Sequence, residues 1–291
     1  MEAEALEDLE VTVVLDTIRR RWGLDFCRYG RLSITRQLRS SSQALGMERV
    51  CELVPLVVHE PERARELVHG LYVSVTRLFR DPEVFRGLVE QVLPELAIQP
   101  RPKIWHAGCA SGEEVYSLAV LIEEAGFLDR ARIYATDINL PALALAGRGA
   151  YPLVSLEAAE SGYVAAGGQR RLRDHLVTLE QQPTHAWKGG PMGMFSRRLR
   201  EKIVWSAHDL TRDAVFAELD LILCRNTLFY FENSMRCEIL DRFRSSLSPR
   251  GWLTLGMSET LEDTATSGFE SYLPELRIYR RRTPWANPRC Q

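Results

Sequence analysis

The stretch Ile104–Glu114, which reads IWHAGCASGEE, decides how the rest of the chain is interpreted. It begins as a short apolar run, continues through small residues and becomes helix-like from Glu113. A strand, a small-residue turn and a helix in this order let the backbone come close to a bound ligand. In a parallel α/β sheet such a turn lies at the carboxyl edge, where ligands bind. A tight turn without any ligand explains the same letters equally well, because an isolated glycine pattern is weak evidence.

Composition and charge limit the class of protein. The chain has 291 residues, 45% of them hydrophobic and 26% charged, which is ordinary for soluble globular proteins. A net charge of −2 gives no reason to expect nucleic-acid binding. The six cysteines form no CxxC pair, which argues against a zinc site and for reduced thiols. With an acidic N-terminus and no long apolar run, we expect a cytoplasmic protein without membrane insertion. Nothing demands a dimer, and we expect a monomer.

The hydrophobic pattern changes once along the chain. Residues 1–93 have helical periodicity and predict a small all-helical domain, followed by a proline-bearing linker over 94–102. Residues 103–282 alternate between strand-like and helix-like segments, which predicts an α/β domain with a doubly wound, mostly parallel sheet. Within it, 151–196 is glycine-rich and can hold a small inserted β-subdomain or an active-site flap. Residues 283–291 form a tail.

Individual elements follow from the same periodicities. The expected helices are Gly30–Leu45, Glu48–Val57, Pro61–Leu71, Asp81–Leu93, Glu113–Ala125, Leu140–Gly147 and Glu232–Leu247. The expected strands are Lys103–His106, Arg132–Thr136, Lys202–Ala207, Leu219–Cys224, Trp252–Met257 and Leu276–Arg280. Asp81 before Pro82 is typical of a helix N-cap. The six histidines show no HxxxH or HExxH spacing, so we expect no metal site.

Asp137 ends the second expected strand, next to the strand that leads into the glycine turn. An acidic residue there is placed to accept hydrogen bonds from the ribose of an adenosine cofactor. Asp also caps helices often, which is the ordinary alternative. Its separation from the turn exceeds the ~20 residues of a dinucleotide fingerprint, and a strict GxGxxG is missing. Both facts weaken a nicotinamide interpretation, which stays a third alternative.

Six motifs in order carry a resemblance to a known family. They are VSVTRLFRDPEVF (73–85), HAGCASGEEVYSLA (106–119), ATDINLPALALAGRGAYP (135–152), LREKIVWSAHDL (199–210), LILCRNTLFYFE (221–232) and GWLTLGMSETL (251–261). With these motifs and the helical region before them, the chain resembles the chemotaxis receptor glutamate methyltransferase (CheR) family from about Gly23 to Arg282.

The resemblance implies a Rossmann-like methyltransferase sheet, the cofactor S-adenosyl-L-methionine and its product S-adenosyl-L-homocysteine. It implies methylation of glutamate side chains on a chemoreceptor or a similar coiled-coil signalling protein. The positions that it makes cofactor-binding are Ser74, Thr76, Arg80, Gly108, Glu113, Asp137, Asp209, Leu210, Arg225 and Asn226. Sequence leaves open whether Glu113 or its neighbour Glu114 faces inward. The resemblance places Tyr230 beside the methyl group.

The expected chemistry suits these residue types. A glutamate carboxylate is ionised near neutral pH, so methyl transfer to it needs alignment rather than a strong base. An arginine can hold one carboxylate oxygen while the other attacks, and we assign this role to Arg80. Tyr230 would hydrogen-bond or shape the site. Without the family, Arg80 is an ordinary surface charge beside a helix start and Tyr230 an ordinary core aromatic.

Departures from the family pattern motivate a second hypothesis. Ser74 stands where the family usually has Asn, and Leu78 where it has a second Phe; Asn139 and Met257 also differ. We expect lower cofactor affinity rather than lost activity, because Ser donates and accepts over a shorter reach than an amide. The alternative is a catalytically weak or inactive binding or regulatory module.

Arg31, Arg36 and Arg39 recur at helical spacing in the expected helix Gly30–Leu45. In the family this helix presents positive charge to the acidic methylation region of the receptor, which makes the three arginines candidate substrate-binding residues. A solvated helix face explains them equally well.

Overall fold

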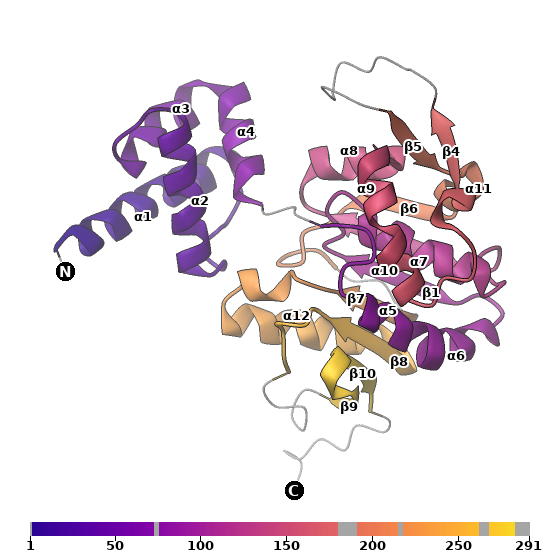
Figure 1. Ribbon diagram of the computed structural model, residues 1–291. Helices are drawn as coiled ribbons and strands as arrows, with labels where there is room; N and C mark the ends of the chain where they lie inside the picture. Colours follow the sequence, from indigo (N-terminus) through magenta and orange to yellow (C-terminus); the bar gives the residue numbers. More distant parts are fainter. Residues whose placement is uncertain (1, 73–75, 180–190, 215–217, 262–267, 283–291) are drawn as a thin grey trace, which may run out of the picture. The chain divides into compact units, whose positions relative to one another are not determined.

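The computed structural model describes residues 2–72, 76–179, 191–214, 218–261 and 268–282 (Figure 1). Its internal contacts divide the chain into two compact units. The first consists of Met1–Val73 together with Phe229–Arg236, and the second of Ser74–Leu228 together with Cys237–Gln291. Among the described residues, no helix is long and apolar enough to cross a membrane.

The first unit is helical. Its elements are α1 (Glu2–Trp22), α2 (Arg31–Ala44), the 3-10 helix η1 (Val50–Glu52), α3 (Leu53–His59) and α4 (Pro61–Leu71). The expected periodicity is confirmed, since Val14 and Ile18 of α1, Leu38 of α2 and Leu53 of α3 are buried in one apolar cluster. This core therefore comes from one face of each helix.

A distant segment of the chain completes this unit. Phe231 forms an isolated antiparallel bridge with Tyr29, and their ring centroids lie 4.8 Å apart. The Gly30 N–H donates to the Tyr230 carbonyl at 2.6 Å, and the Glu232 N–H donates to the Arg28 carbonyl at 3.0 Å. Residues 229–236 are thus part of the helical unit although they lie between two strands of the large sheet in sequence, after Cys224 and before Leu247.

The second unit begins with a helical stretch that differs from expectation. The helix expected over Asp81–Leu93 is α5 (Pro82–Gly87), a π-helical turn η2 (Leu88–Val92) and α6 (Leu93–Ala97). Pro94, predicted to start a linker, lies in the first turn of α6. Proline removes a backbone donor, and the wider π turn before it lets the helix continue past that gap.

A seven-stranded sheet forms the centre of the second unit, in the order β6-β2-β1-β7-β8-β10-β9. Its strands are β1 (Lys103–Ala107), β2 (Arg132–Asp137), β6 (Ile203–Ala207), β7 (Leu219–Cys224), β8 (Leu247–Leu255), β9 (Phe269–Leu273) and β10 (Ile278–Arg281). The first five strands in this order pair in parallel, and β10 is antiparallel to both β8 and β9. The expected Rossmann-like, mostly parallel sheet is confirmed, with β9 as an unpredicted strand.

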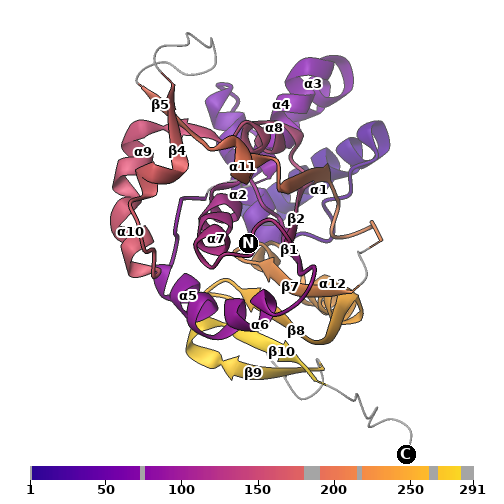
Figure 2. The ribbon, with the colours of Figure 1, turned by 90° about the vertical axis from the view of Figure 1, so that its right-hand side faces the viewer.

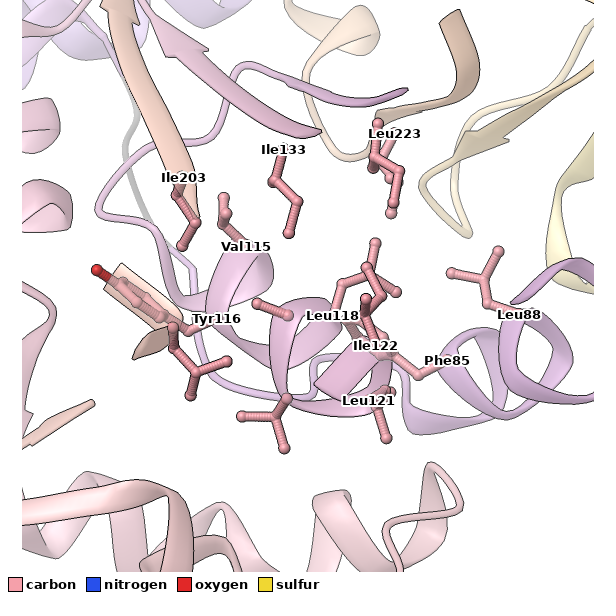
Figure 3. Close-up of a cluster of buried hydrophobic side chains, with 14 of the residues drawn as sticks. Phe85, Leu88, Val115, Tyr116, Leu118, Leu121, Ile122, Ile133, Ile203 and Leu223 are labelled. Carbon is pink, nitrogen blue, oxygen red and sulfur yellow. The ribbon is translucent and has the colours of Figure 1, made fainter. Parts of the chain in front are cut away.

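Helices cover both faces of this sheet. Ile104 of β1 lies in the apolar cluster with Val115 and Leu118 of α7 (Glu113–Glu124). The next residue, Trp105, points to the opposite face, where its ring lies 5.4 Å from Phe243 of α12 (Asn233–Ser246). Figure 3 shows α7 side chains facing side chains of the strands: Val115, Leu118 and Ile122 on the helix, and Ile133, Ile203 and Leu223 on the strands. The sheet is therefore doubly wound.

A second, small sheet occupies the glycine-rich stretch. Its three strands run in the order β3 (Ala150–Pro152), β5 (Met192–Phe195) and β4 (Leu176–Leu179), all antiparallel. An inserted β-subdomain was one of two expectations for 151–196. The surrounding helices are α8 (Leu140–Arg148), α9 (Leu153–Ala158), α10 (Glu160–Ala165), η3 (Leu172–His175) and α11 (Arg197–Arg200). In Figures 1 and 2, α9 lies beside this small sheet.

Candidate cofactor site at the carboxyl edge of the sheet

The candidate site residues of the second unit gather at one edge of the large sheet. Gly108 and Glu113 follow β1, Asp137 ends β2, Asp209 and Leu210 follow β6, and Arg225 and Asn226 follow β7. These four strands are neighbours and parallel, so their carboxyl ends share one edge. Moreover, the strand order reverses between β1 and β7, which is where open α/β sheets form a ligand crevice.

The glycine turn needs its glycines. Gly108 and Gly112 have φ of 78° and 89°, conformations that residues with a side chain rarely adopt. A Cβ atom on Gly108 would lie 2.6 Å from Thr227 Oγ1, and one on Gly112 would lie 2.8 Å from the Ala146 Cβ. The turn after β1 therefore packs directly against the turn after β7 and against α8.

The turn's amide groups are already used inside the protein. The N–H groups of Gly108 and Cys109 both donate to the Thr136 carbonyl at 2.9 Å. The Ala110 N–H donates to the Asp137 carboxylate at 2.7 Å. A pyrophosphate needs free amides and avoids carboxylates, so this turn does not suit a dinucleotide.

Asp137 has a defined local role. Its two carboxylate oxygens accept the backbone N–H groups of Ala110 at 2.7 Å and Asn139 at 2.8 Å. The N-cap of α8 is Asn139, whose side chain accepts from Ala142 N–H, so capping is not the work of Asp137. Burial raises the pKa of the Asp137 carboxyl, although these hydrogen bonds oppose that rise. A carboxylate has about four lone-pair sites, so this side chain can still accept a hydrogen bond from a ligand hydroxyl.

The two adjacent glutamates of α7 differ in their surroundings. Glu113 accepts a hydrogen bond from the Ser111 hydroxyl at 2.7 Å, and burial raises its pKa. Glu114 instead lies 3.1 Å from His106 Nδ1 and 3.0 Å from the Arg225 guanidinium. These two partners outweigh the effect of burial and lower the pKa of Glu114. Glu113 is thus the carboxylate without a cationic partner among the described residues.

Arg225 lies at the centre of a buried ion network. Its side chain is 1% exposed and donates to Glu114, to the Asp81 carboxylate at 2.7 Å and to the Arg80 carbonyl at 3.1 Å. Its guanidinium carbon also lies 5.4 Å from the centre of the Phe85 ring. Asp81 occupies the N-cap position of α5 but makes no capping hydrogen bond. Both terminal nitrogens of Arg225 are therefore engaged within the protein, whereas its Nε has no hydrogen-bond partner among the described residues. Asp81 and His106 were not predicted as site components, and Glu114 was named only as the alternative to Glu113.

Glu259 is a further residue that sequence reasoning missed. It is 5% exposed, and its carboxylate accepts the backbone N–H groups of Asn226, Thr227 and Gly256. Asn226 has a φ of 57°, which its neighbours must hold in place. Glu259 thus joins the turns that follow β7 and β8. Its position in the sequence could have indicated a role, because Glu259 follows a buried strand and lies within the GMSET motif.

Asp209 and Leu210 lie beyond the end of β6. The Asp209 carboxylate accepts from the backbone and the hydroxyl of Thr211 at 2.8 and 2.7 Å, which closes a local turn. Leu210 is 8% exposed, and its carbonyl accepts from Arg242 at 2.9 Å. The segment Asp209–Leu210 therefore presents an apolar side chain and backbone groups, which suit contact with a planar ring of a ligand.

The loop before α5 holds the remaining predicted residues of this unit. Thr76 and Arg80 are both half-buried, and no described residue accepts a hydrogen bond from the Arg80 guanidinium. Leu78 is buried in the main apolar cluster, where an aliphatic side chain fills the space. Ser74 and residues 283–291 lie outside the described residues.

The other predicted residues lie in the helical unit. Tyr230 is held there through its carbonyl by Gly30. Arg31 pairs with Asp8 at 2.7 Å, and Arg39 pairs with Glu7. Arg36 is exposed and has no ion-pair partner among the described residues. The predicted positive face of α2 is thus partly neutralised by α1.

Comparison with protein families agrees with this geometry. Residues 74–273 match the family described as CheR methyltransferase, SAM binding domain. The chain belongs to the CheR methyltransferase family. It is accordingly an S-adenosylmethionine-dependent methyltransferase, which confirms the predicted family and cofactor.

Named relatives of this CheR protein cover most of its length. A Pseudomonas putida protein named "Putative methyltransferase Cher3" is 35% identical over 97% of this chain and 100% of its own. A chemotaxis protein methyltransferase of Vibrio anguillarum is 32% identical over 68% of this chain and 70% of its own. Chemotaxis protein methyltransferase 1 of Vibrio cholerae is 29% identical over 81% of this chain and 88% of its own.

The residues at the sheet edge of this CheR protein fit S-adenosylmethionine. That cofactor has a cationic sulfonium and an ammonium group but no phosphate. Glu113 and Asp137 are half-buried carboxylates whose pKa values are raised by desolvation, and a cationic ligand would stabilise their charged forms. Glu113 would hold the ammonium group, Asp137 the ribose hydroxyls, and Leu210 the adenine.

Proposed function

We propose that this protein transfers the methyl group of S-adenosylmethionine to glutamate side chains of a chemoreceptor or a related coiled-coil signalling protein, forming methyl esters. The observation that carries the proposal is the placement of Arg80. Its carbonyl is anchored to Arg225 at 3.1 Å, while its guanidinium has no acceptor among the described residues. Relatives named chemotaxis protein methyltransferase support the same substrate class.

The chemistry asks the protein for placement more than for proton transfer. The bound cofactor supplies an electrophilic methyl carbon on a sulfonium. The attacking glutamate oxygen is already ionised near neutral pH, so no general base is required. The proposed role of Arg80 is to hold one substrate oxygen in a charge-assisted hydrogen bond, which leaves the other oxygen free to attack.

The carboxylates of the site favour the replacement of bound product by fresh cofactor. Glu113 and Asp137 attract the cationic cofactor more strongly than the product, because S-adenosylhomocysteine has lost the sulfonium charge. The proposed role of Tyr230 is to shape the approach of the substrate to the transferred methyl group. Arg36 is the residue of α2 best placed to attract an acidic substrate, since Arg31 and Arg39 have partners in α1.

Two measurements test the proposal. Calorimetry with S-adenosylhomocysteine should give binding below millimolar ligand. Incubation with methyl-labelled S-adenosylmethionine and receptor cytoplasmic fragments should give base-labile label, and fragments whose methylation-region glutamates are replaced by alanine should give none. Cofactor binding without any transfer would favour the regulatory-module alternative.

Arg80→Ala tests the catalytic assignment. We expect kcat to fall by about 100-fold or more, the usual loss when a group that aligns developing charge is removed. Arg77→Ala is the matched control, since Arg77 is an exposed arginine of the same loop. A full rate in Arg80→Ala would remove Arg80 from the mechanism.

A further inference from the structure

The backbone around Arg80 is in an unfavourable conformation on both sides. Phe79 and Asp81 have φ of 50° and 55°, the left-handed region that residues with a side chain seldom adopt. Such conformations are strained and persist only where their surroundings hold them. The conformation that presents Arg80 therefore requires external support.

The contacts of this loop supply that support from two directions. The Phe79 N–H donates to the Ser117 hydroxyl oxygen at 2.8 Å, and this hydroxyl donates to the Glu113 carbonyl at 2.7 Å. Arg225 binds the Arg80 carbonyl and the Asp81 carboxylate through one guanidinium nitrogen. Its other terminal nitrogen binds Glu114 on α7. The loop is thus tied to the first turn of α7, where Glu113 lies.

Burial makes this network a rigid support. The Arg225 side chain is 1% exposed, and those of Asp81 and Glu114 are 23% and 17% exposed. Ion pairs in such surroundings are weakly screened, and losing one partner leaves an uncompensated charge. An arginine fork fixes direction as well as charge, because its donors lie in one plane.

We infer that Asp81 and Arg225 are positioning residues, which hold the Arg80 loop in register with the cofactor-binding end of α7. The inference rests on the proposed function, since Arg80 is taken as the group that aligns the substrate. It assigns Asp81 a role that its N-cap position does not suggest. It also gives the Arg225 side chain a role other than contact with the cofactor.

Asp81→Asn is the informative substitution. Asparagine tolerates a positive φ at least as well as aspartate, so the change removes the ion pair without adding backbone strain. Glu83→Gln is the matched control, because Glu83 is an exposed carboxylate in the first turn of α5. Asp81→Glu keeps the charge and serves as the conservative rescue.

The test is a double-mutant cycle with Arg80→Ala. If Asp81 acts through Arg80, Asp81→Asn should lower kcat about 10-fold in the wild-type background and less than about 2-fold in the Arg80→Ala background. The affinity for S-adenosylhomocysteine should change less than about 3-fold, because Glu113 and Asp137 are untouched. Asp81→Glu should recover part of the rate, and Glu83→Gln should match wild type.

Hydrogen–deuterium exchange of residues 76–88 provides a readout that needs no activity. Asp81→Asn should speed exchange there, and Glu83→Gln should not. Equal kcat losses in both backgrounds, or unchanged exchange, would overturn the inference. Absence of methyl transfer by the wild-type protein would instead refute the proposed function, and the exchange result would still decide whether Asp81 holds the loop.

Discussion

Two neighbouring regions of the sheet edge treat carboxylates in opposite ways. At the end of the glycine turn, the half-buried Glu113 accepts a hydrogen bond from the Ser111 hydroxyl, and desolvation raises its pKa. One residue later, Glu114 belongs to the ion network of Arg225 and His106, and its pKa is lowered. The Glu113 carboxylate is thus available to a cationic ligand, whereas the Glu114 carboxylate stabilises the folded protein through its ion pairs.

The difference shows how one helix start serves binding and folding together. Consecutive helical residues point about 100° apart, so adjacent glutamates reach different neighbours. Glu114 stabilises the fold through its partners. Ionised Glu113 instead lowers the stability of the protein until a cationic ligand binds beside it. Substitutions at the two positions should therefore separate stability from cofactor affinity.

The largest expected effect is on stability, in Glu114→Ala. Removing one member of a buried ion network typically costs about 3–5 kcal/mol, and Glu114→Ala would leave Arg225 with Asp81 as its one ion-pair partner among the described residues and His106 without its carboxylate. Urea unfolding followed by circular dichroism measures this free energy. A loss below about 1 kcal/mol would mean that Glu114 behaves like an exposed ion pair.

Glu113→Ala should give the converse result. The dissociation constant of S-adenosylhomocysteine should rise about 10- to 100-fold, which corresponds to the loss of a charge-assisted hydrogen bond. The free energy of unfolding should stay within about 1 kcal/mol of wild type, because no ion pair is broken. Calorimetry and urea unfolding of the same preparation check both, and a stability loss equal to that of Glu114→Ala would erase the contrast.

The pH dependence should also differ between the two regions. The raised pKa values of Glu113 and Asp137 mean that acidification protonates them before an ordinary exposed carboxyl, so cofactor affinity should fall first. Glu114 has a lowered pKa, so its contribution to stability is present above its unfolded pKa and is lost as the pH falls through the folded one. Calorimetric titrations across the acidic range should show affinity declining before stability, and Glu113→Gln should weaken that early decline.

The smallest effects should come from the exposed ion pairs of the helical unit. Arg39→Ala breaks a pair with Glu7 in which Arg39 is 54% exposed, and such pairs contribute about 0–1 kcal/mol. Thermal unfolding should therefore change little. For receptor methylation, Arg36→Ala should raise KM more than Arg39→Ala, and equal KM values would remove α2 from substrate recognition.

Much of the sheet could be predicted from periodicity. β7 was predicted at its observed bounds, and β1, β2 and α7 within one residue, because buried parallel strands read as continuous apolar runs. The small β3-β5-β4 sheet was not resolved into strands, since its short strands pair across long stretches of sequence. Short segments of that kind carry little periodic signal.

The site was predictable at the level of residue types but not of partners. Spacing placed Asp137 beside the glycine turn, yet Asn139 two residues later was not recognised as the helix cap. Asp81 matched the pattern of an N-cap, while its actual partner is Arg225, far away in sequence. Pairings of this kind depend on tertiary contacts, which a single sequence does not contain.

The bridge between Tyr29 and Phe231 has a consequence for biosynthesis. A ribosome adding about 5–20 residues per second exposes residues 229–236 on the order of 10 seconds after the N-terminal helices. Until then Tyr29 lacks the ring of Phe231, and the Gly30 amide lacks its carbonyl acceptor. The N-terminal helices are synthesised first, but their unit cannot complete its folding until residues 229–236 have been made. In a nascent chain arrested before residue 229, the helical unit should therefore be incompletely folded.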